Sequence, residues 1–387
     1  MRILILGNTA NSGYPIAKEL RKMNYDVDLA LNLSDSVFCF PHWEEGNIEN
    51  DSDPIKLDPL EILNCWNSPD WIRYFDTYSK VPRKKLLLKK FGSRINLLKI
   101  AREYDFVESH FPYQVYLQFS GVPYVTFDTG WMRYVPSGNK FLDRLIRRGY
   151  KKSKAIILTN PDTYEIVDNL SYLDKEKIHF APFSIDPEKY KPSDHRKLRE
   201  QFVKDGELLL FSPTRQEWDV KGNDKMIKAY AKFVKKFPNS KFVIVSWSVD
   251  KERSKSLVDD LDISNNVIWI TPVHKNKLIE YYNASDIVLE QFLIGSWGAG
   301  TLEAMSCGKP VLMFYNKNLI LRAFGEEPPI LNSFNEDEIY SNLVMLADDP
   351  KIRKDIGQKS RDWIIKTHSP NIVARRHLEI ILNTIRR

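Results

Sequence analysis

The chain has 387 residues, of which 43% are hydrophobic, and it carries a net charge of +6. This length suffices for two or three domains of ordinary size with their own cores, so a soluble globular protein is expected. The three cysteines lie far apart, which argues against a disulfide framework or a structural zinc site. The apolar run at the start is too short for an export signal, and no run reaches the ~20 residues of a bilayer-spanning helix. We therefore expect a cytoplasmic protein.

Strand and helix patterns alternate from the first residues onward. The run RILILG at 2–7 predicts a buried strand, residues 14–23 an amphipathic helix, and residues 24–31 a second strand. Such alternation predicts a parallel sheet with ligand sites at the carboxyl ends of its strands. Further strands are expected at 105–112, 122–130 and 155–159. The first loop lacks the pattern G-x-G-x-x-G, so no nicotinamide cofactor is expected.

The same alternation resumes after residue 195. Strands are predicted at 208–212, 242–246, 267–270 and 287–290, and a helix over 223–237 that is capped near Asn223–Asp224. The chain closes with an amphipathic helix over 371–387.

The stretch 283–313 organises the second half. A strand that ends at Glu290 leads into the loop Gly295-Ser-Trp-Gly-Ala-Gly-Thr301, and a helix follows over 302–307. A glycine loop before a helix exposes backbone N–H groups and the positive helix end to an anion. The residues expected at this anion are Gly298, Ala299, Gly300 and Thr301. Glu303 lies one turn into the helix, where a carboxylate can reach a ribose hydroxyl beside a bound diphosphate.

The whole string resembles the donor-nucleotide motif of glycosyltransferases with the GT-B fold, most closely family 4, the glycosyl transferases group 1. Gly298 and the run from Leu302 to Val311 match the family pattern, whereas Gly295 stands where the family has an acidic residue. The resemblance implies two Rossmann-like α/β domains whose parallel sheets face each other across a cleft. Residues 1–190 would bind the acceptor, residues 191–370 would hold a nucleotide-sugar donor, and the last helix would cross back onto the first domain.

The family also implies residues that grip the donor. Arg215 and Lys221, on the loop after the strand 208–212, match an Arg/Lys pair that binds the donor phosphates. Val273 and His274 fall where the family holds the nucleobase. Because fixed cations and N–H donors can neutralise the departing diphosphate, the expected mechanism uses no metal and no other cofactor.

The sugar-facing side leaves the stereochemistry open. His110 stands at a family histidine, with Ser12 and Gly13 on the same acceptor side. Asp128 replaces a second histidine and could act as a general base, which would suit inversion. The resemblance implies retention instead, by front-face attack with the donor phosphate as base, and Glu290 is the candidate to replace the missing carboxylate.

Basic residues gather in the first half. Residues 83–102 contain eight basic and no acidic residues, interleaved with Leu, Ile and Phe, and further basic clusters follow at 144–148 and 151–154. Such faces can lie on an anionic membrane. An ordinary core-facing helix with a solvated basic side would show the same sequence pattern. Residues 38–78, rich in Asp, Pro and Trp, are interpreted either as an acceptor-side wall or as an excursion packed on the core.

The expected activity is that of a glycosyltransferase of the hexosyltransferase type. The donor would be a UDP-sugar, and the acceptor a surface glycan or a lipid-linked glycan at the inner face of the membrane. No nucleic-acid partner is expected. Two alternatives stay open: a nucleotide-sugar 2-epimerase of the same fold, and a non-catalytic partner subunit that lost the sugar-binding carboxylate at Gly295.

Overall fold

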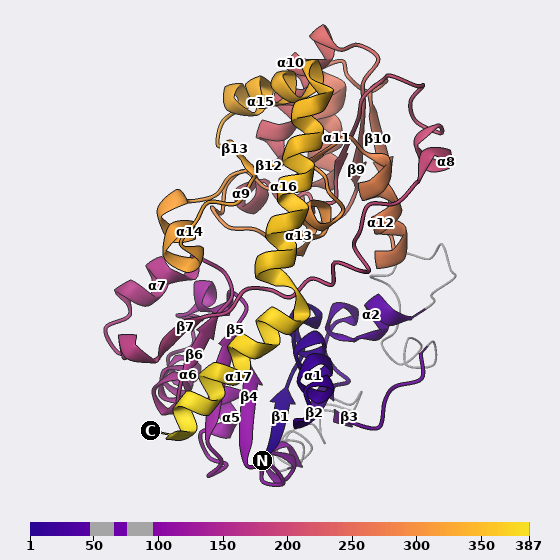
Figure 1. Cartoon of the computed structure of the whole chain (residues 1–387). Coiled ribbons are helices and arrows are strands. Elements are labelled where there is room, and N and C mark those ends of the chain that lie inside the picture. Colours follow the sequence, from indigo (N-terminus) through magenta and orange to yellow (C-terminus); the bar gives the residue numbers. More distant parts are fainter. Residues whose placement is uncertain (47–65, 76–95, 387) are drawn as a thin grey trace, which may run out of the picture. The chain divides into compact units, whose positions relative to one another are not determined.

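The computed structural model describes residues 1–46, 66–75 and 96–386. The chain divides into two compact units, a first unit of residues 1–184 with 370–387, and a second unit of residues 185–369 (Figure 1). Each unit contains one parallel sheet. The α/β class with two parallel sheets, expected from the sequence, is confirmed.

The described part of the first unit holds a seven-stranded sheet in the order β3-β2-β1-β4-β5-β6-β7. Because β1 is followed by β2 and β3 on one side and then by β4 on the other, the sheet reverses its growth between β1 and β4. Its strands are β1 (Arg2–Leu6), β2 (Asp26–Asn32), β3 (Ile72–Phe75), β4 (Phe106–His110), β5 (Tyr124–Asp128), β6 (Ile156–Leu158) and β7 (Ile178–Phe180). Its helices are α1 (Gly13–Lys22), α2 (His42–Glu45), α5 (Gln114–Leu117), α6 (Lys140–Lys152), α7 (Thr163–Asn169) and α17 (Pro370–Arg386), with 3-10 turns at Thr9–Asn11, Val37–Cys39, Trp131–Tyr134 and Lys175–Lys177.

Alternate residues of β1 feed two cores on opposite faces of this sheet. Ile3 and Ile5 pack with residues of α1 and α17, whereas Leu4 and Leu6 pack with Leu97 and other apolar residues on the other face. The last helix is therefore part of the core of the first unit. A buried side-chain hydrogen bond adds to this, because His377 Nδ1 lies 2.9 Å from Glu108 Oε2.

The described part of residues 38–78 packs on this core. Trp66 and Trp71 contact the ring of Tyr14 on α1 at centroid distances of 5.8 and 5.7 Å. Residues 72–75 form β3, an edge strand that the sequence did not predict. The remainder of this stretch, and residues 83–95 of the basic segment, lie outside the described residues.

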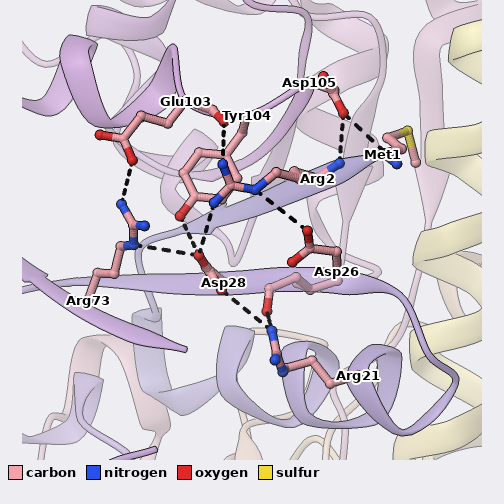
Figure 2. Close-up of polar contacts among 10 residues, drawn as sticks. Met1, Arg2, Arg21, Asp26, Asp28, Arg73, Glu103, Tyr104 and Asp105 are labelled. Carbon is pink, nitrogen blue, oxygen red and sulfur yellow. Dashed lines mark hydrogen bonds and ion pairs between the residues drawn. The ribbon is translucent and has the colours of Figure 1, made fainter. Parts of the chain in front are cut away.

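A cluster of charged side chains lies at the amino-terminal ends of the strands of this sheet (Figure 2). The carboxylate of Asp28 accepts a hydrogen bond from Tyr104 Oη at 2.5 Å and lies within 3.5 to 3.9 Å of guanidinium nitrogens of Arg2, Arg21 and Arg73. A mostly buried carboxylate needs such compensation. These residues satisfy one another at the edge opposite to the carboxyl ends of the strands.

The described part of the second unit holds a six-stranded sheet in the order β10-β9-β8-β11-β12-β13. Its strands are β8 (Leu209–Ser212), β9 (Lys241–Val245), β10 (Val267–Ile270), β11 (Ile287–Leu289), β12 (Val311–Met313) and β13 (Leu331–Asn332). Its helices are α8 (Arg196–Arg199), α9 (Trp218–Lys221), α10 (Asn223–Lys236), α11 (Lys251–Asp260), α12 (Lys275–Ala284), α13 (Ala299–Ser306), α14 (Lys317–Phe324), α15 (Glu336–Asp348) and α16 (Pro350–His368). None of the helices within the described ranges is both long and apolar enough to cross a membrane.

Candidate functional site

The strand order of the second unit reverses between β8 and β11, which are neighbours in the sheet. In open parallel sheets, ligands bind outside the carboxyl ends of the strands at such a reversal. Two connections leave the sheet there, residues 213–222 after β8 and residues 290–298 after β11. They carry Arg215, Lys221, Glu290 and Gly298, and the second connection leads into α13 (Ala299–Ser306), which carries the other predicted residues of the glycine loop and Glu303.

Glu290 joins these connections. Its Oε1 accepts a hydrogen bond from Thr214 Oγ1 at 3.3 Å and lies 4.0 Å from Lys221 Nζ. A Cβ atom at Gly298 would lie 3.8 Å from the same oxygen. The residue is only 5% exposed, and its Oε2 has no hydrogen-bond partner among the described residues. Glu290 therefore marks the point where both connections meet the start of α13, with one buried carboxylate oxygen that has no hydrogen-bond partner among the described residues.

The two predicted phosphate-binding cations have different partners. Lys221 ends α9, its side chain is 14% exposed, and its carbonyl accepts a hydrogen bond from Phe292 N at 2.7 Å, which ties the two connections together. Arg215 pairs with the carboxylate of Glu217 and is more exposed. Lys221 is therefore the cation that lies at Glu290.

Asn223 does not cap α10 as expected. The N-cap position is Gly222, in the left-handed conformation with φ +65°. The Asn223 amide instead accepts a hydrogen bond from Glu217 N at 2.9 Å and donates one to Arg215 O at 3.2 Å. Buried and fully engaged in this way, it holds the backbone beside Arg215.

The helix α13 begins three residues earlier than predicted. Gly298 occupies the N-cap position in an extended conformation without a side-chain cap, and no acidic residue lies in the first turn. Ala299, Gly300 and Thr301 therefore form the first turn, whose N–H groups donate no hydrogen bond to a capping side chain at the N-cap position. A Cβ at Gly300 would lie 3.2 Å from Pro213 Cγ, so glycine lets this turn approach the loop after β8.

Thr301 and Gly295 lie at the two ends of the glycine loop, and the structure gives each a defined conformation. The Thr301 hydroxyl is buried and donates to Met313 Sδ at 3.4 Å, so its side chain points toward β12. Gly295 has φ +76°, and a Cβ there would lie 3.3 Å from Phe314 Cε1. A carboxylate at position 295 would be strained in this loop conformation.

Gln291 shapes the glycine loop and was missed in the sequence. Its Nε2 donates to the carbonyls of Ser296 and Phe314, and its Oε1 accepts from Leu293 N and Ile294 N. The buried side-chain amide of Gln291 thus provides hydrogen-bond partners for backbone groups of the loop after β11, which regular secondary structure would otherwise pair. Nothing in the local sequence distinguishes this glutamine, because its partners depend on how the loop folds back.

Glu303 is the fifth residue of α13, and it is only 1% exposed. Its Oε1 pairs with Lys275 Nζ, and its Oε2 accepts a hydrogen bond from Tyr282 Oη at 3.1 Å. Burial and the Glu303 charge raise the pKa of Tyr282 well above its usual value, so the phenol stays a donor. Lys275 is the second residue that sequence reasoning missed, although it directly follows the predicted pair Val273 and His274.

Val273 and His274 lie half-buried on the loop between β10 and α12. His274 is the N-cap of α12, and its Nδ1 accepts a hydrogen bond from Asn276 N at 3.4 Å. Because Lys275 reaches Glu303, this loop and the first turns of α13 are brought together.

The predicted acceptor residues gather at the reversal between β1 and β4 in the first unit. A Cβ at Gly13 would lie 3.0 Å from His110 Nε2, so the two residues are neighbours. Burial lowers the pKa of His110 to about 4, and its ring nitrogens have no hydrogen-bond partner among the described residues. The Ser12 hydroxyl donates to Thr9 O at 2.7 Å. Asn8, not predicted, caps α1 by accepting from Gly13 N and Tyr14 N.

Asp128, the candidate base, is fully buried at the end of β5. Its Oδ2 accepts from Tyr150 Oη at 2.6 Å, and its Oδ1 accepts from Gly130 N at 2.8 Å and Met132 N at 3.4 Å. Burial raises the pKa of Asp128 despite these hydrogen bonds. This is the geometry of a carboxylate that shapes the turn after β5.

No group of three His, Cys, Asp or Glu side chains that could hold a metal ion occurs within the described ranges.

Comparison with known proteins finds similarity to glycosyltransferases. Residues 194–363 match the family model of glycosyl transferases group 1. The chain is 23% identical over 242 residues to the D-inositol 3-phosphate glycosyltransferase of Acidothermus cellulolyticus, covering 60% of this chain and 51% of that protein. It is 24% identical over 243 residues to the alpha-monoglucosyldiacylglycerol synthase of Acholeplasma laidlawii, covering 61% and 59%. The chain thus spans about half to three fifths of the length of these curated relatives.

A likeness to a solved structure extends over the whole chain. The crystal structure of HepE from Anabaena in complex with UDP and glucose superposes with a TM-score of 0.73 at 16% identity, covering 98% of this chain and 99% of that protein. At this identity the likeness establishes the fold. The fold expected from the resemblance is thereby confirmed: the chain has the GT-B fold, and residues 194–363 of its second unit are similar to glycosyl transferases group 1.

Proposed function

We propose that the chain transfers a sugar from a nucleoside-diphosphate sugar, of the UDP type, to a glycan or lipid-linked acceptor. The observation that carries this proposal is the convergence of Lys221, Glu290 and the uncapped start of α13 at the strand reversal of the second unit. The complex of HepE with UDP and glucose supports the choice of nucleotide. The name of one curated relative, which contains a glucosylated diacylglycerol, supports a lipid-linked acceptor.

The proposed role of Lys221 and the α13 amides is to bind the diphosphate as it becomes the leaving group. Sugar transfer develops negative charge on the phosphate oxygens, and preorganised donors aimed at that charge lower the barrier. Removing one such donor typically costs about 3–4 kcal/mol of transition-state stabilisation. In this proposal the positive charge comes from Lys221, Arg215 and the helix end, and no metal or other cofactor takes part.

Two carboxylates complete the proposed donor site. Glu290 would accept a hydroxyl of the transferred sugar through its Oε2, in place of the acid that the left-handed backbone excludes at position 295. Glu303 would accept a ribose hydroxyl and share its charge with Lys275. We favour retention with the donor phosphate as base, because the carboxylate of Asp128 is already engaged by three hydrogen bonds.

The donor site is tested with Lys221→Ala and titration calorimetry with UDP. We expect the affinity to fall about tenfold to a hundredfold, because a hydrogen bond to a charged group contributes about 1.5–3 kcal/mol. Lys235→Ala, which removes an exposed lysine at the far end of α10, is the matched control and should bind UDP as the wild type does. Equal affinity of all three proteins would refute the site.

The reaction is tested with a panel of UDP-sugars and GDP-sugars, each with and without acceptor glycans. Sugar transfer to an acceptor supports the proposal. Formation of an epimeric donor without any acceptor would instead identify a 2-epimerase, and nucleotide binding without turnover across the panel would identify a non-catalytic subunit.

A further inference from the structure

The helix α6 (Lys140–Lys152, Figure 1) has an outward face that the donor site does not use. It contains eight exposed residues: Lys140, Phe141, Leu142, Arg144, Arg147, Arg148, Lys151 and Lys152. Six are basic and two are large and apolar. The one acidic residue of the helix, Asp143, is buried and accepts a hydrogen bond from Ser137 N at 2.7 Å. The exposed surface of α6 therefore carries positive charge and no negative charge.

The cations form a line along the helix. Lys140, Arg144, Arg147 and Lys151 follow the spacing i, i+4, i+7 and i+11, which places them on one face over about 16 Å of helix. Within the described residues, no carboxylate forms an ion pair with Lys140, Arg144 or Lys151. Four like charges in a row repel one another, so this line is stabilised when an anionic surface covers it.

The opposite face of α6 is fixed to the body of the first unit. Tyr150 Oη donates to Asp128, Gln118 Nε2 donates to Leu145 O at 3.1 Å, and Tyr124 Oη donates to Gly149 O at 2.6 Å. A Cβ at Gly149 would lie 2.9 Å from the Gln114 carbonyl, so the helix backbone packs directly on α5. The basic face cannot turn inward.

Apolar side chains border the basic face. Phe141 is 70% exposed, Leu142 follows it, and Trp131 and Tyr134 are exposed in the turn that precedes the helix. Phe119 is half exposed, with the Arg148 guanidinium 5.2 Å from its ring centroid. Aromatic rings beside cations are typical of surfaces that enter the interfacial layer of a bilayer while lysine and arginine meet its phosphates.

We propose that the outward face of α6, with Phe141 at its start, is a docking surface for an anionic lipid membrane. The six cations supply the charge complementarity, and Phe141 and Leu142 supply the apolar contact that a purely ionic partner would not require. This inference concerns the first unit and does not depend on the donor site.

The test is flotation of the full chain with vesicles of phosphatidylcholine, with and without phosphatidylglycerol, at low and high salt. The wild type should bind only vesicles with phosphatidylglycerol, and high salt should weaken that binding. The variant Lys140→Gln, Arg144→Gln, Lys151→Gln should bind about a hundredfold more weakly, since each cation near an anionic surface contributes about fivefold. Phe141→Ala should lower binding about tenfold at either salt.

The matched control is Lys235→Gln, Lys351→Gln, Lys354→Gln, which removes three exposed lysines of the second unit and changes the net charge equally. It should float as the wild type does. Equal binding of the α6 variant and the wild type, equal losses in both triple variants, or no wild-type binding to phosphatidylglycerol would each overturn the proposal. Tighter binding to an RNA oligonucleotide than to vesicles would also overturn it. UDP affinity should be unchanged in the α6 variant, which separates this test from that of the donor site.

Discussion

Replacing Glu303 by alanine should destabilise the second unit as well as weaken nucleotide binding. The substitution removes the carboxylate that pairs with Lys275 and accepts the hydrogen bond of Tyr282. Both partners would remain inside the protein, because the side chain of Lys275 is only 15% exposed and Tyr282 is fully buried. The ammonium of Lys275 and the phenol of Tyr282 would then lose their protein partner without gaining full contact with water.

The magnitude follows from this burial. Breaking a buried ion pair by removing one partner costs about 3–5 kcal/mol. For a unit of this size, each kcal/mol lowers the melting temperature by about 2–4 °C, so we expect a decrease of about 6–20 °C. By contrast, Glu280→Ala breaks a partly exposed pair with Lys277 on the surface of α12 and should cost no more than about 1 kcal/mol.

The assay is differential scanning calorimetry of the wild type, Glu303→Ala, Glu280→Ala and the double variant Lys275→Met, Glu303→Gln. The double variant removes both charges and keeps an acceptor for Tyr282, so most of the stability should return. If Glu303 holds the ribose, this stable double variant still binds UDP about tenfold to a hundredfold more weakly. Equal melting temperatures of Glu303→Ala and Glu280→Ala, or a double variant as unstable as Glu303→Ala, would refute the reasoning.

Three further predictions concern the loop, the buried histidine and the candidate base. Gly295→Ala should lower the unfolding free energy by about 1–3 kcal/mol and weaken UDP binding. Gly325 has a similar φ of +74° but open space around it, so Gly325→Ala should lower the unfolding free energy by less and leave UDP binding unchanged. Urea unfolding and calorimetry with UDP compare the two variants. Burial lowers the pKa of His368 to about 3 from 6.5, so the unfolded chain takes up the proton first as pH falls. The stability contribution is complete above pH 6.5 and decreases toward pH 3, by about 2 kcal/mol between pH 7 and 5. His368→Phe should reduce the difference in urea midpoint between these two pH values, and an unchanged difference would contradict the assignment. Asp128→Asn should keep kcat within about tenfold and preserve the anomeric outcome, because Asp128 shapes a turn; a thousandfold loss of kcat would instead support a general base.

The order of strands and helices was largely readable from the sequence because it depends on local patterns. The apolar run of β1, the amphipathic spacing of α1 and the glycines before α13 each report the structure of their own neighbourhood. The edge strand β3 was missed, since its four residues follow a stretch without clear periodicity. The start of α13 was placed three residues too late, because the glycine at position 300 suggests a loop, whereas its approach to Pro213 makes it a residue of the first turn.

The partners of the site residues could not be read in the same way. Lys275 and Glu303 are 28 residues apart, and Lys221 meets Glu290 only because β8 and β11 lie side by side. The hydroxyl of Thr301 could equally have faced a phosphate, and the contact with Met313 depends on the packing of α13 against β12.

By itself, the sequence determined that this protein has two α/β halves and a glycine-bearing helix start suited to an anion, because residue spacing and backbone chemistry decide these features within a few turns. Only the tertiary structure decided which charged groups lie beside one another and which carboxylate oxygen has no hydrogen-bond partner among the described residues. Glu108 meets His377 across 269 residues, and Glu290 keeps one oxygen unengaged where two connections cross. The physical reason is that burial makes each charge depend on its nearest partner, and that partner is chosen by packing between segments that are distant in the chain.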